Sequence, residues 1–181
     1  MVKLRQLIAG LMTATVLVSS TTPVDAQKRS VGVASLGEMS CQTAGEGHYK
    51  VINKDFPIAL QILRGIAKFT VGPGNLIYKN KIGQVVCRVT EAGQRSVYKT
   101  LNLKFGIADN GRYADGALVR LSIYRDGNFH RYEDITKGKI FILPIDISNV
   151  RSIALEAECL RGGVKSKDHC PELIFFEDIL E

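Results

Sequence analysis

The sequence predicts an all-β sandwich or jelly roll, and three observations support this. From residue 68 onward, short β-branched and aromatic runs recur at regular spacing, separated by turns rich in Gly, Asp and Asn. In ALVRLSIYR (117–125), Val119, Leu121 and Ile123 fall on one face, the period of a half-buried strand. Asp126-Gly127 between two such runs is a strong hairpin signal. We therefore expect many short strands packed in layers.

Nine runs between residues 68 and 180 are expected to be strands. The alternation in SIALEAEC directs Leu155, Ala157 and Cys159 inward. The earlier run FPIALQILRGI (56–66) is short enough to be either a short helix or a buried strand. In order, the nine runs are KFTV (68–71), NLIY (75–78), QVVCRV (84–89), VYKTLNLKFGI (97–107), ALVRLSIYR (117–125), NFHRYE (128–133), KIFILPIDI (139–147), SIALEAEC (152–159) and LIFFEDIL (173–180).

The N-terminus has the pattern of a secretory signal peptide covering residues 1–26. Two basic residues precede an apolar run of about a dozen residues, too short to span a membrane, and small residues follow at the expected cleavage site. Residues 27–66 are then a lead-in that could pack on the sandwich, and 67–181 form one domain. We expect an exported protein, secreted or periplasmic, without membrane insertion.

The mature chain is basic. Removing residues 1–26 takes away two of 24 basic residues and one of 18 acidic ones, which leaves a net charge of +5. Basic and acidic residues are interleaved, as in YRDGNFHRYED, so a solvated mixed surface is favoured over a nucleic-acid-binding stripe. A partner for the excess charge would be an acidic glycan or an anionic envelope surface.

Four cysteines in an exported chain indicate two disulfides. No C-x-x-C pair is present, which makes a zinc site the poorer interpretation. Three pairings are possible. We favour Cys159 with Cys170, because they flank the short polar loop LRGGVKSKDH, and then Cys41 with Cys87 by elimination.

An ordered set of motifs between residues 68 and 180 resembles the NPCBM family of galactose-binding-like, β-jelly-roll carbohydrate-binding modules. The resemblance implies a secreted, non-catalytic glycan-binding module. The matching pieces are YKNKIG (78–83), LNLKFGIAD (101–109), ALVRLSIYRDGNFHRYEDI (117–135), FILPIDISNVRSIALEAEC (141–159) and KDHCPELIFFEDIL (167–180).

The chain departs from this family at two places that concern sugar binding. Lys81 and Val85 stand where the family has a glycine and a histidine, and the chain contains no tryptophan. Asp168-His169 is followed by Cys-Pro-Glu, where the family continues with Ala-Asp-Trp. Sugar binding usually needs an aromatic plate and a few fixed polar groups. A tyrosine would have to provide the plate here.

The candidate ligand-binding residues are charged or aromatic and belong to three segments. The loop ADNGRYADG (108–116) combines acidic groups with an arginine and a tyrosine that could stack on a ring, although a solvated Gly-rich connection is an alternative. Two aspartates of this loop could instead hold a structural calcium, but their spacing fits no calcium motif. No cofactor is otherwise expected. The candidates are Asp109, Arg112, Tyr113, Asp115, Tyr78 and His169.

The sequence leaves three classes of function open. A carbohydrate-binding module is the first, and an exported structural or protein-interaction jelly roll that has lost the sugar site is the second. A small secreted hydrolase is the third. No nucleophile frame such as G-x-S-x-G is present, so we expect no catalytic residues and no enzymatic activity. The sugar and the oligomeric state do not follow from the sequence.

Overall fold

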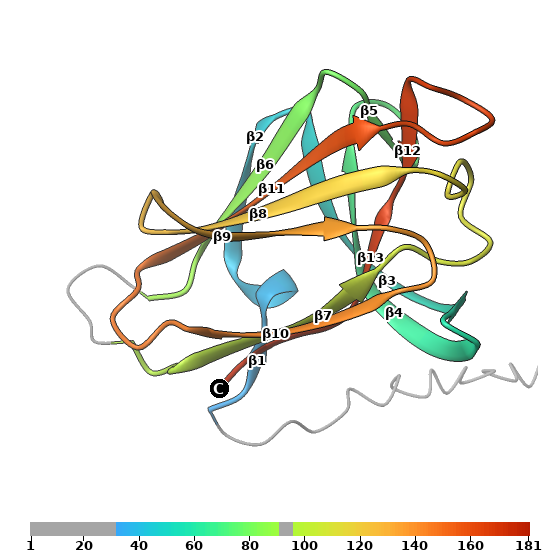
Figure 1. Ribbon diagram of the computed structural model, residues 1–181. Helices are drawn as coiled ribbons and strands as arrows, with labels where there is room; N and C mark the ends of the chain where they lie inside the picture. The colour runs from blue at the N-terminus through green and yellow to red at the C-terminus, as the bar shows by residue number, and fades with distance from the viewer. Residues whose placement is uncertain (1–31, 91–95) are drawn as a thin grey trace, which may run out of the picture.

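The computed structural model describes residues 32–90 and 96–181, and the expected signal peptide lies outside these ranges. The described chain folds into two packed β-sheets (Figure 1). The smaller sheet has the strand order β2-β6-β11-β8-β9, and each neighbouring pair is antiparallel. Its strands are β2 (Ser40–Gly45), β6 (Ile82–Arg88), β8 (Leu118–Arg125), β9 (Asn128–Ile135) and β11 (Ser152–Arg161).

The larger sheet has the order β10-β7-β13-β4-β5-β12, with β1 beside β13 and β3 beside β4. Its pairs are antiparallel apart from the short contact between β4 and β5. Its strands are β1 (Ala34–Ser35), β3 (Gly47–Ile58), β4 (Gln61–Val71), β5 (Leu76–Tyr78), β7 (Thr100–Gly106), β10 (Ile140–Asp146), β12 (His169–Pro171) and β13 (Leu173–Leu180). A 3-10 turn, η1 (Leu36–Glu38), follows β1. No described helix is long or apolar enough to cross a membrane.

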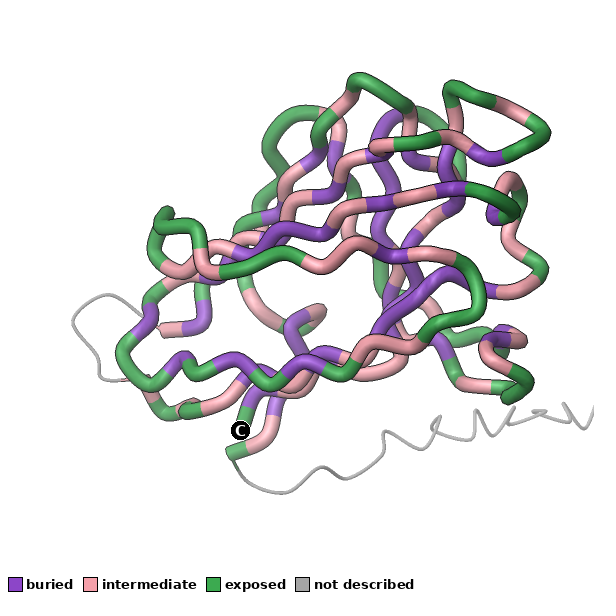
Figure 2. Tube along the Cα trace, viewed as in Figure 1, coloured by how far each residue is buried: buried purple, intermediate pink, exposed green. Residues whose placement is uncertain are grey.

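One hydrophobic core lies between the two sheets, and the alternation seen in the sequence fills it. Val119, Leu121 and Ile123 of β8 are fully buried, as expected, and so are the inward residues of β11. Figure 2 shows buried and more exposed positions alternating along these strands, whereas fully exposed positions concentrate in the turns and loops. Each of the nine runs expected to be a strand overlaps a strand of the structure, so the prediction of an all-β sandwich is confirmed.

The Asp126-Gly127 hairpin is also confirmed. Both residues have positive φ, 48° and 78°, as a tight turn between β8 and β9 requires. Asp126 has a second role that the motif does not predict. Its Oδ1 accepts hydrogen bonds from the backbone N–H groups of Arg151 and Ser152, so the turn also fixes the start of β11.

The option of a short helix near residues 56–66 is wrong. These residues form the end of β3 and the start of β4. The two strands pair from Ile58, opposite Gln61, back to Gly47, opposite Val71. Ala59 and Leu60 make the turn with φ of 50° and 62°, although neither is a glycine or an asparagine. The sequence left a helix possible because this turn lacks the Asn, Asp or Gly residues that normally mark a hairpin.

The segment expected as a lead-in supplies strands to both sheets. β2 pairs with β6 in the smaller sheet, and β3 pairs with β4 in the larger one. A domain boundary at residue 66 would fall inside β4.

Both disulfides have the pairing favoured from the sequence. Cys41–Cys87 joins directly opposed residues of β2 and β6, and Cys159–Cys170 joins β11 to β12. The described residues contain no free cysteine.

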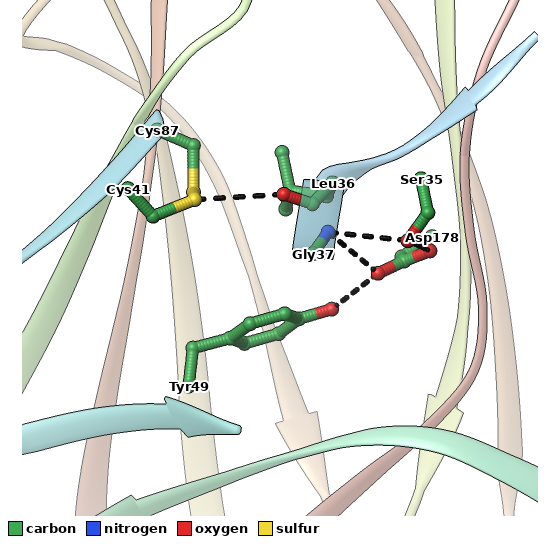
Figure 3. The surroundings of a disulfide bond; sticks show 7 residues. All are labelled: Ser35, Leu36, Gly37, Cys41, Tyr49, Cys87 and Asp178. Carbon is green, nitrogen blue, oxygen red and sulfur yellow. Dashed lines mark hydrogen bonds between the residues drawn. A yellow bond between two sulfur atoms is a disulfide. The ribbon is translucent and has the colours of Figure 1, made fainter. Parts of the chain in front are cut away.

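A buried carboxylate ties the first described residues to the larger sheet (Figure 3). Asp178 of β13 is 1% exposed. It accepts hydrogen bonds from Ser35 Oγ at 2.6 Å, Tyr49 Oη at 2.7 Å and the Gly37 N–H at 3.3 Å. Burial raises the pKa of Tyr49 well above its usual value, and the charge and hydrogen bond of Asp178 act in the same direction. The phenol therefore remains a donor to the carboxylate.

We expect Tyr49→Phe to lower the free energy of unfolding at pH 7 by about 1–3 kcal/mol, because Asp178 loses a donor while buried. In the native chain an unfolded tyrosine ionises near pH 10 but folded Tyr49 does not. Its contribution to stability is therefore intact below about pH 10 and declines as the pH rises from there toward the folded pKa. The free energy of unfolding, measured by urea titration between pH 7 and 11, should decline less steeply with rising pH in Tyr49→Phe than in the surface control Tyr132→Phe. Equal slopes would contradict this role.

Candidate functional site

Three aromatic side chains from separate segments meet at one end of the sandwich. The Tyr78 and His169 rings are 4.6 Å apart between centroids and nearly perpendicular, at 72°. The Tyr113 ring stacks on His169, with 5.5 Å between the ring centroids and an interplanar angle of 27°. The Arg112 guanidinium lies 4.9 Å from the centroid of the Tyr113 ring. We call Tyr78, His169 and Tyr113 the aromatic row.

The pairing of two short strands positions the first two members of the row. Tyr78 ends β5 and His169 begins β12, and the two residues are directly opposed in the antiparallel register. Residues opposed in this way have neighbouring side chains. Ser166 Oγ lies 2.6 Å from His169 Nδ1 and fixes the orientation of the imidazole, while Nε2 has no hydrogen-bond partner among the described residues.

Tyr113 is held in a backbone conformation that bulky residues rarely adopt. Its φ is 64°, in the left-handed region. Consecutive turns run through the loop, from the Gly111 N–H to Ala108 O and from the Ala114 N–H to Gly111 O. Ala114 is buried and anchors the loop to the core. Strained residues of this kind persist where the surroundings enforce them and often occur at functional sites.

A second loop, residues 162–168, clamps the loop that carries Tyr113. A Cβ atom on Gly163 would lie 2.1 Å from the Tyr113 carbonyl oxygen, so only glycine allows this approach. The Val164 N–H donates to Asp115 O at 2.7 Å, and Arg161 Nε donates to Gly116 O at 2.9 Å. The Cys159–Cys170 disulfide closes the base of the clamping loop.

Two hollows adjoin the aromatic row, and Arg112 lines both. The Tyr113 hollow measures about 500 Å³ and is lined by Asn110, Gly111, Arg112, Tyr113, Asp115 and Lys165. The Tyr78 hollow measures about 420 Å³ and is lined by Asn75, Leu76, Tyr78, Arg112 and Glu172 with the Pro73-Gly74 turn.

Ion pairs within the fold compensate both acidic groups of the hollows. Lys137 Nζ donates to Asp115 at 2.7 Å, and this hydrogen bond and its charge lower the pKa of Asp115. In the Tyr78 hollow, Lys68 Nζ contacts Glu172 at 2.9 Å and Asn75 Oδ1 at 2.6 Å. The carboxylates are therefore fixed in position and their charges are largely balanced.

Five of the six candidate residues lie on the aromatic row or in the hollows. Asp109 lines neither hollow, and its N–H donates to Pro57 O in the β3–β4 hairpin. No group of three or more His, Cys, Asp or Glu residues in the described ranges could hold a metal ion. The sequence reasoning missed Lys165, Asn75 and Glu172, which belong to polar loops without a motif.

A third hollow, of about 280 Å³, lies on the outer face of β2 and β6 and has no aromatic lining residue. It therefore offers no ring for stacking. Ser166 and His169 form the one serine–histidine hydrogen bond among the described residues, but it is a local contact through Nδ1, and no described carboxylate hydrogen-bonds to Nε2. A catalytic triad is thus not assembled here.

No protein-family model matches the chain, and no curated protein matches its sequence significantly. Solved structures that contain CBM51 carbohydrate-binding modules do match its fold. At this low identity the likeness concerns the fold alone. The chain therefore has a galactose-binding-like β-sandwich fold, as the motif resemblance implied.

The similar structures are CBM51 modules of Clostridium perfringens. One, from GH95 in complex with methyl-galactose, is 14% identical with a TM-score of 0.53, over 82% of this chain and 99% of that chain. Another is the CBM51-2 and INT fragment of ZmpB in complex with GlcNAc, 12% identical with a TM-score of 0.56. The match covers 82% of this chain but only 31% of the ZmpB fragment.

We expect Gly163→Ala to displace the loop that carries Tyr113, because the new methyl group would collide with backbone atoms. Overpacking of this kind costs about 1–3 kcal/mol. The NMR signals of the Tyr113 and His169 rings should shift, since their stacking would change. Gly127→Ala, in the β8–β9 turn, is the control: it incurs a left-handed backbone cost of about 1–2 kcal/mol but its new Cβ meets no atom within 4 Å. Unchanged ring signals in Gly163→Ala would refute the clamp.

Proposed function

We propose that this protein is a secreted, non-catalytic carbohydrate-binding module that recognises a cell-wall or extracellular glycan at the aromatic row. The observation that carries the proposal is the contiguous set Tyr78–His169–Tyr113 with Arg112 beside it. These residues come from three loops or strand ends, and internal contacts hold each of them in place.

The chemistry of these side chains suits a sugar. The apolar face of a pyranose ring packs on an aromatic ring, and its hydroxyl groups need fixed donors and acceptors nearby. Tyr78 and Tyr113 supply rings in the two hollows. Asn75, His169 Nε2 and Arg112 supply polar groups around them. Tyrosine would thus serve in place of the tryptophan that the chain lacks.

The structural neighbours support this class of function without identifying a ligand. Two of the CBM51 structures contain methyl-galactose or GlcNAc. Both are named as binding modules, which supports a non-catalytic role for this chain.

Export is supported by the cysteine chemistry. Two disulfides persist in oxidising compartments and are rare in the cytosol. The signal-peptide pattern of residues 1–26 agrees with this.

A second candidate function is an exported protein-interaction or structural domain. The outer face of β8 and β9 favours it, because Phe129 is 57% exposed and Tyr132 is 49% exposed. These rings lie 6.4 Å apart, and Arg120 lies 4.1 Å from the Tyr132 centroid. Exposed aromatic and arginine side chains are enriched at protein interfaces.

Binding of the purified protein to a glycan array, in low and in physiological salt, tests the first proposal. We expect salt-resistant binding to one related set of sugars, reduced at least tenfold by Tyr113→Ala, because burying a large side chain of this kind against a ligand contributes about 1.5–3 kcal/mol. Tyr132→Ala changes a residue on the outer face of the smaller sheet, away from the aromatic row, and should bind as the native protein does.

Complete loss of binding in physiological salt would indicate charge attraction alone, since the Debye length is then about 8 Å. That result, or no binding at all, would favour the protein-interaction function. An equal loss of glycan binding in Tyr113→Ala and Tyr132→Ala would show that the aromatic row is not the binding site.

A further inference from the structure

The Tyr113 hollow has more positive charge than its own carboxylate balances. Asp115, the acidic residue of its lining, is already paired with Lys137. Arg112 and Lys165 also line this hollow, and neither forms an ion pair with a carboxylate of residues 32–90 or 96–181. Asp115 is the one carboxylate that lines this hollow, and its charge acts on both Lys137 and Lys165, so the remaining excess of positive charge favours an anionic ligand.

Arg112 is the better placed of the two cations for specific recognition. Its guanidinium is held over the Tyr113 ring, at 4.9 Å from the centroid, so part of its conformational freedom is already lost. A guanidinium presents a planar fork of donors that matches a carboxylate with two parallel hydrogen bonds. No hydrogen bond to another described residue occupies that fork.

The Tyr78 hollow differs in charge although it shares Arg112. Its carboxylate, Glu172, is paired with Lys68, and Asn75 is held by the same lysine. The hollow therefore offers a tyrosine ring and neutral or compensated polar groups, which suits a sugar ring without regard to charge. Each hollow, at about 500 and 420 Å³, is larger than a single sugar unit requires.

We propose that the ligand is an oligosaccharide of at least two units, in which a carboxylate-bearing sugar occupies the Tyr113 hollow and binds Arg112, while the adjacent unit occupies the Tyr78 hollow. This inference rests on the proposed function. Lys165 adds an unspecific attraction for the same carboxylate. The carboxylate could belong to a uronic acid or to a sialic acid, because both present the same group to a guanidinium.

Calorimetric titration with matched pairs of sugars tests this inference. One arm uses oligogalacturonides of one to three units and their methyl esters, which keep the ring and remove the charge. The other arm uses sialyllactose and its methyl ester. In one of the two arms we expect the acid to bind at least tenfold more tightly than the ester, since a charge-assisted pair is lost. A ligand of two or more units should also bind more tightly than its single acidic unit.

Two charge-matched variants make the test specific. Arg112→Gln should weaken binding of the acid at least tenfold and binding of the ester much less, because the ester forms no charge-assisted pair with Arg112 that the variant could lose. Arg131→Gln removes the same charge from β9, where Arg131 pairs with Glu133, and should change neither. Equal weakening in both variants would reduce the effect to net charge and overturn the inference.

The outcomes separate this inference from the function on which it rests. Equal affinity for acid and ester in both arms, or binding of neutral sugars alone, would overturn the acidic ligand while the carbohydrate-binding function stands. Equal affinity for one and two units would overturn the two-hollow arrangement. Absence of binding to every sugar on the array would overturn both.

Discussion

The buried carboxylate of Asp178 is the interaction on which the N-terminal part of the fold depends. A charge with 1% exposure is costly unless several donors satisfy it. Here the donors come from β1, η1 and β3, which are remote from β13 in the sequence. With η1 held in place, Leu36 enters the core and β2 begins at the correct position beside β6. The Cys41–Cys87 disulfide then secures that pairing.

At the aromatic row, close contacts between backbone atoms hold two loops together, and no buried charge is involved. Loop 108–117 contacts loop 162–168 through peptide groups, and Gly163 makes the closest approach. Tyr113 stays in a left-handed conformation because neighbours on both sides of it are fixed. The stacking of Tyr113 on His169 therefore depends on the two loops together, whereas Tyr78 and His169 themselves belong to β5 and β12 of the larger sheet.

The sequence predicted the sandwich well where burial follows a period of two, as in β8 and β11, and where Asp-Gly marks a turn. It did not resolve the β3–β4 hairpin, because Ala59 and Leu60 adopt a turn that normally requires Asn or Gly. At the candidate site, residue types pointed to Tyr113, Arg112 and His169, but their contacts depend on long-range pairing. Lys165 carried no local signal, since its role follows only from the position of the clamping loop.

The Cys159–Cys170 disulfide closes a loop of ten intervening residues between β11, the central strand of the smaller sheet, and β12, an end strand of the larger sheet. Loop closure depends only slowly on loop length, and a covalent closure at the base makes the ends insensitive to what lies between them. Exposed positions of this segment, such as Lys165, can therefore change during evolution without disturbing either sheet, whereas Gly163 is constrained by its contact with Tyr113. Divergence of ligand preference among descendants of this chain would begin in the disulfide-closed loop, with the β-framework inherited unchanged.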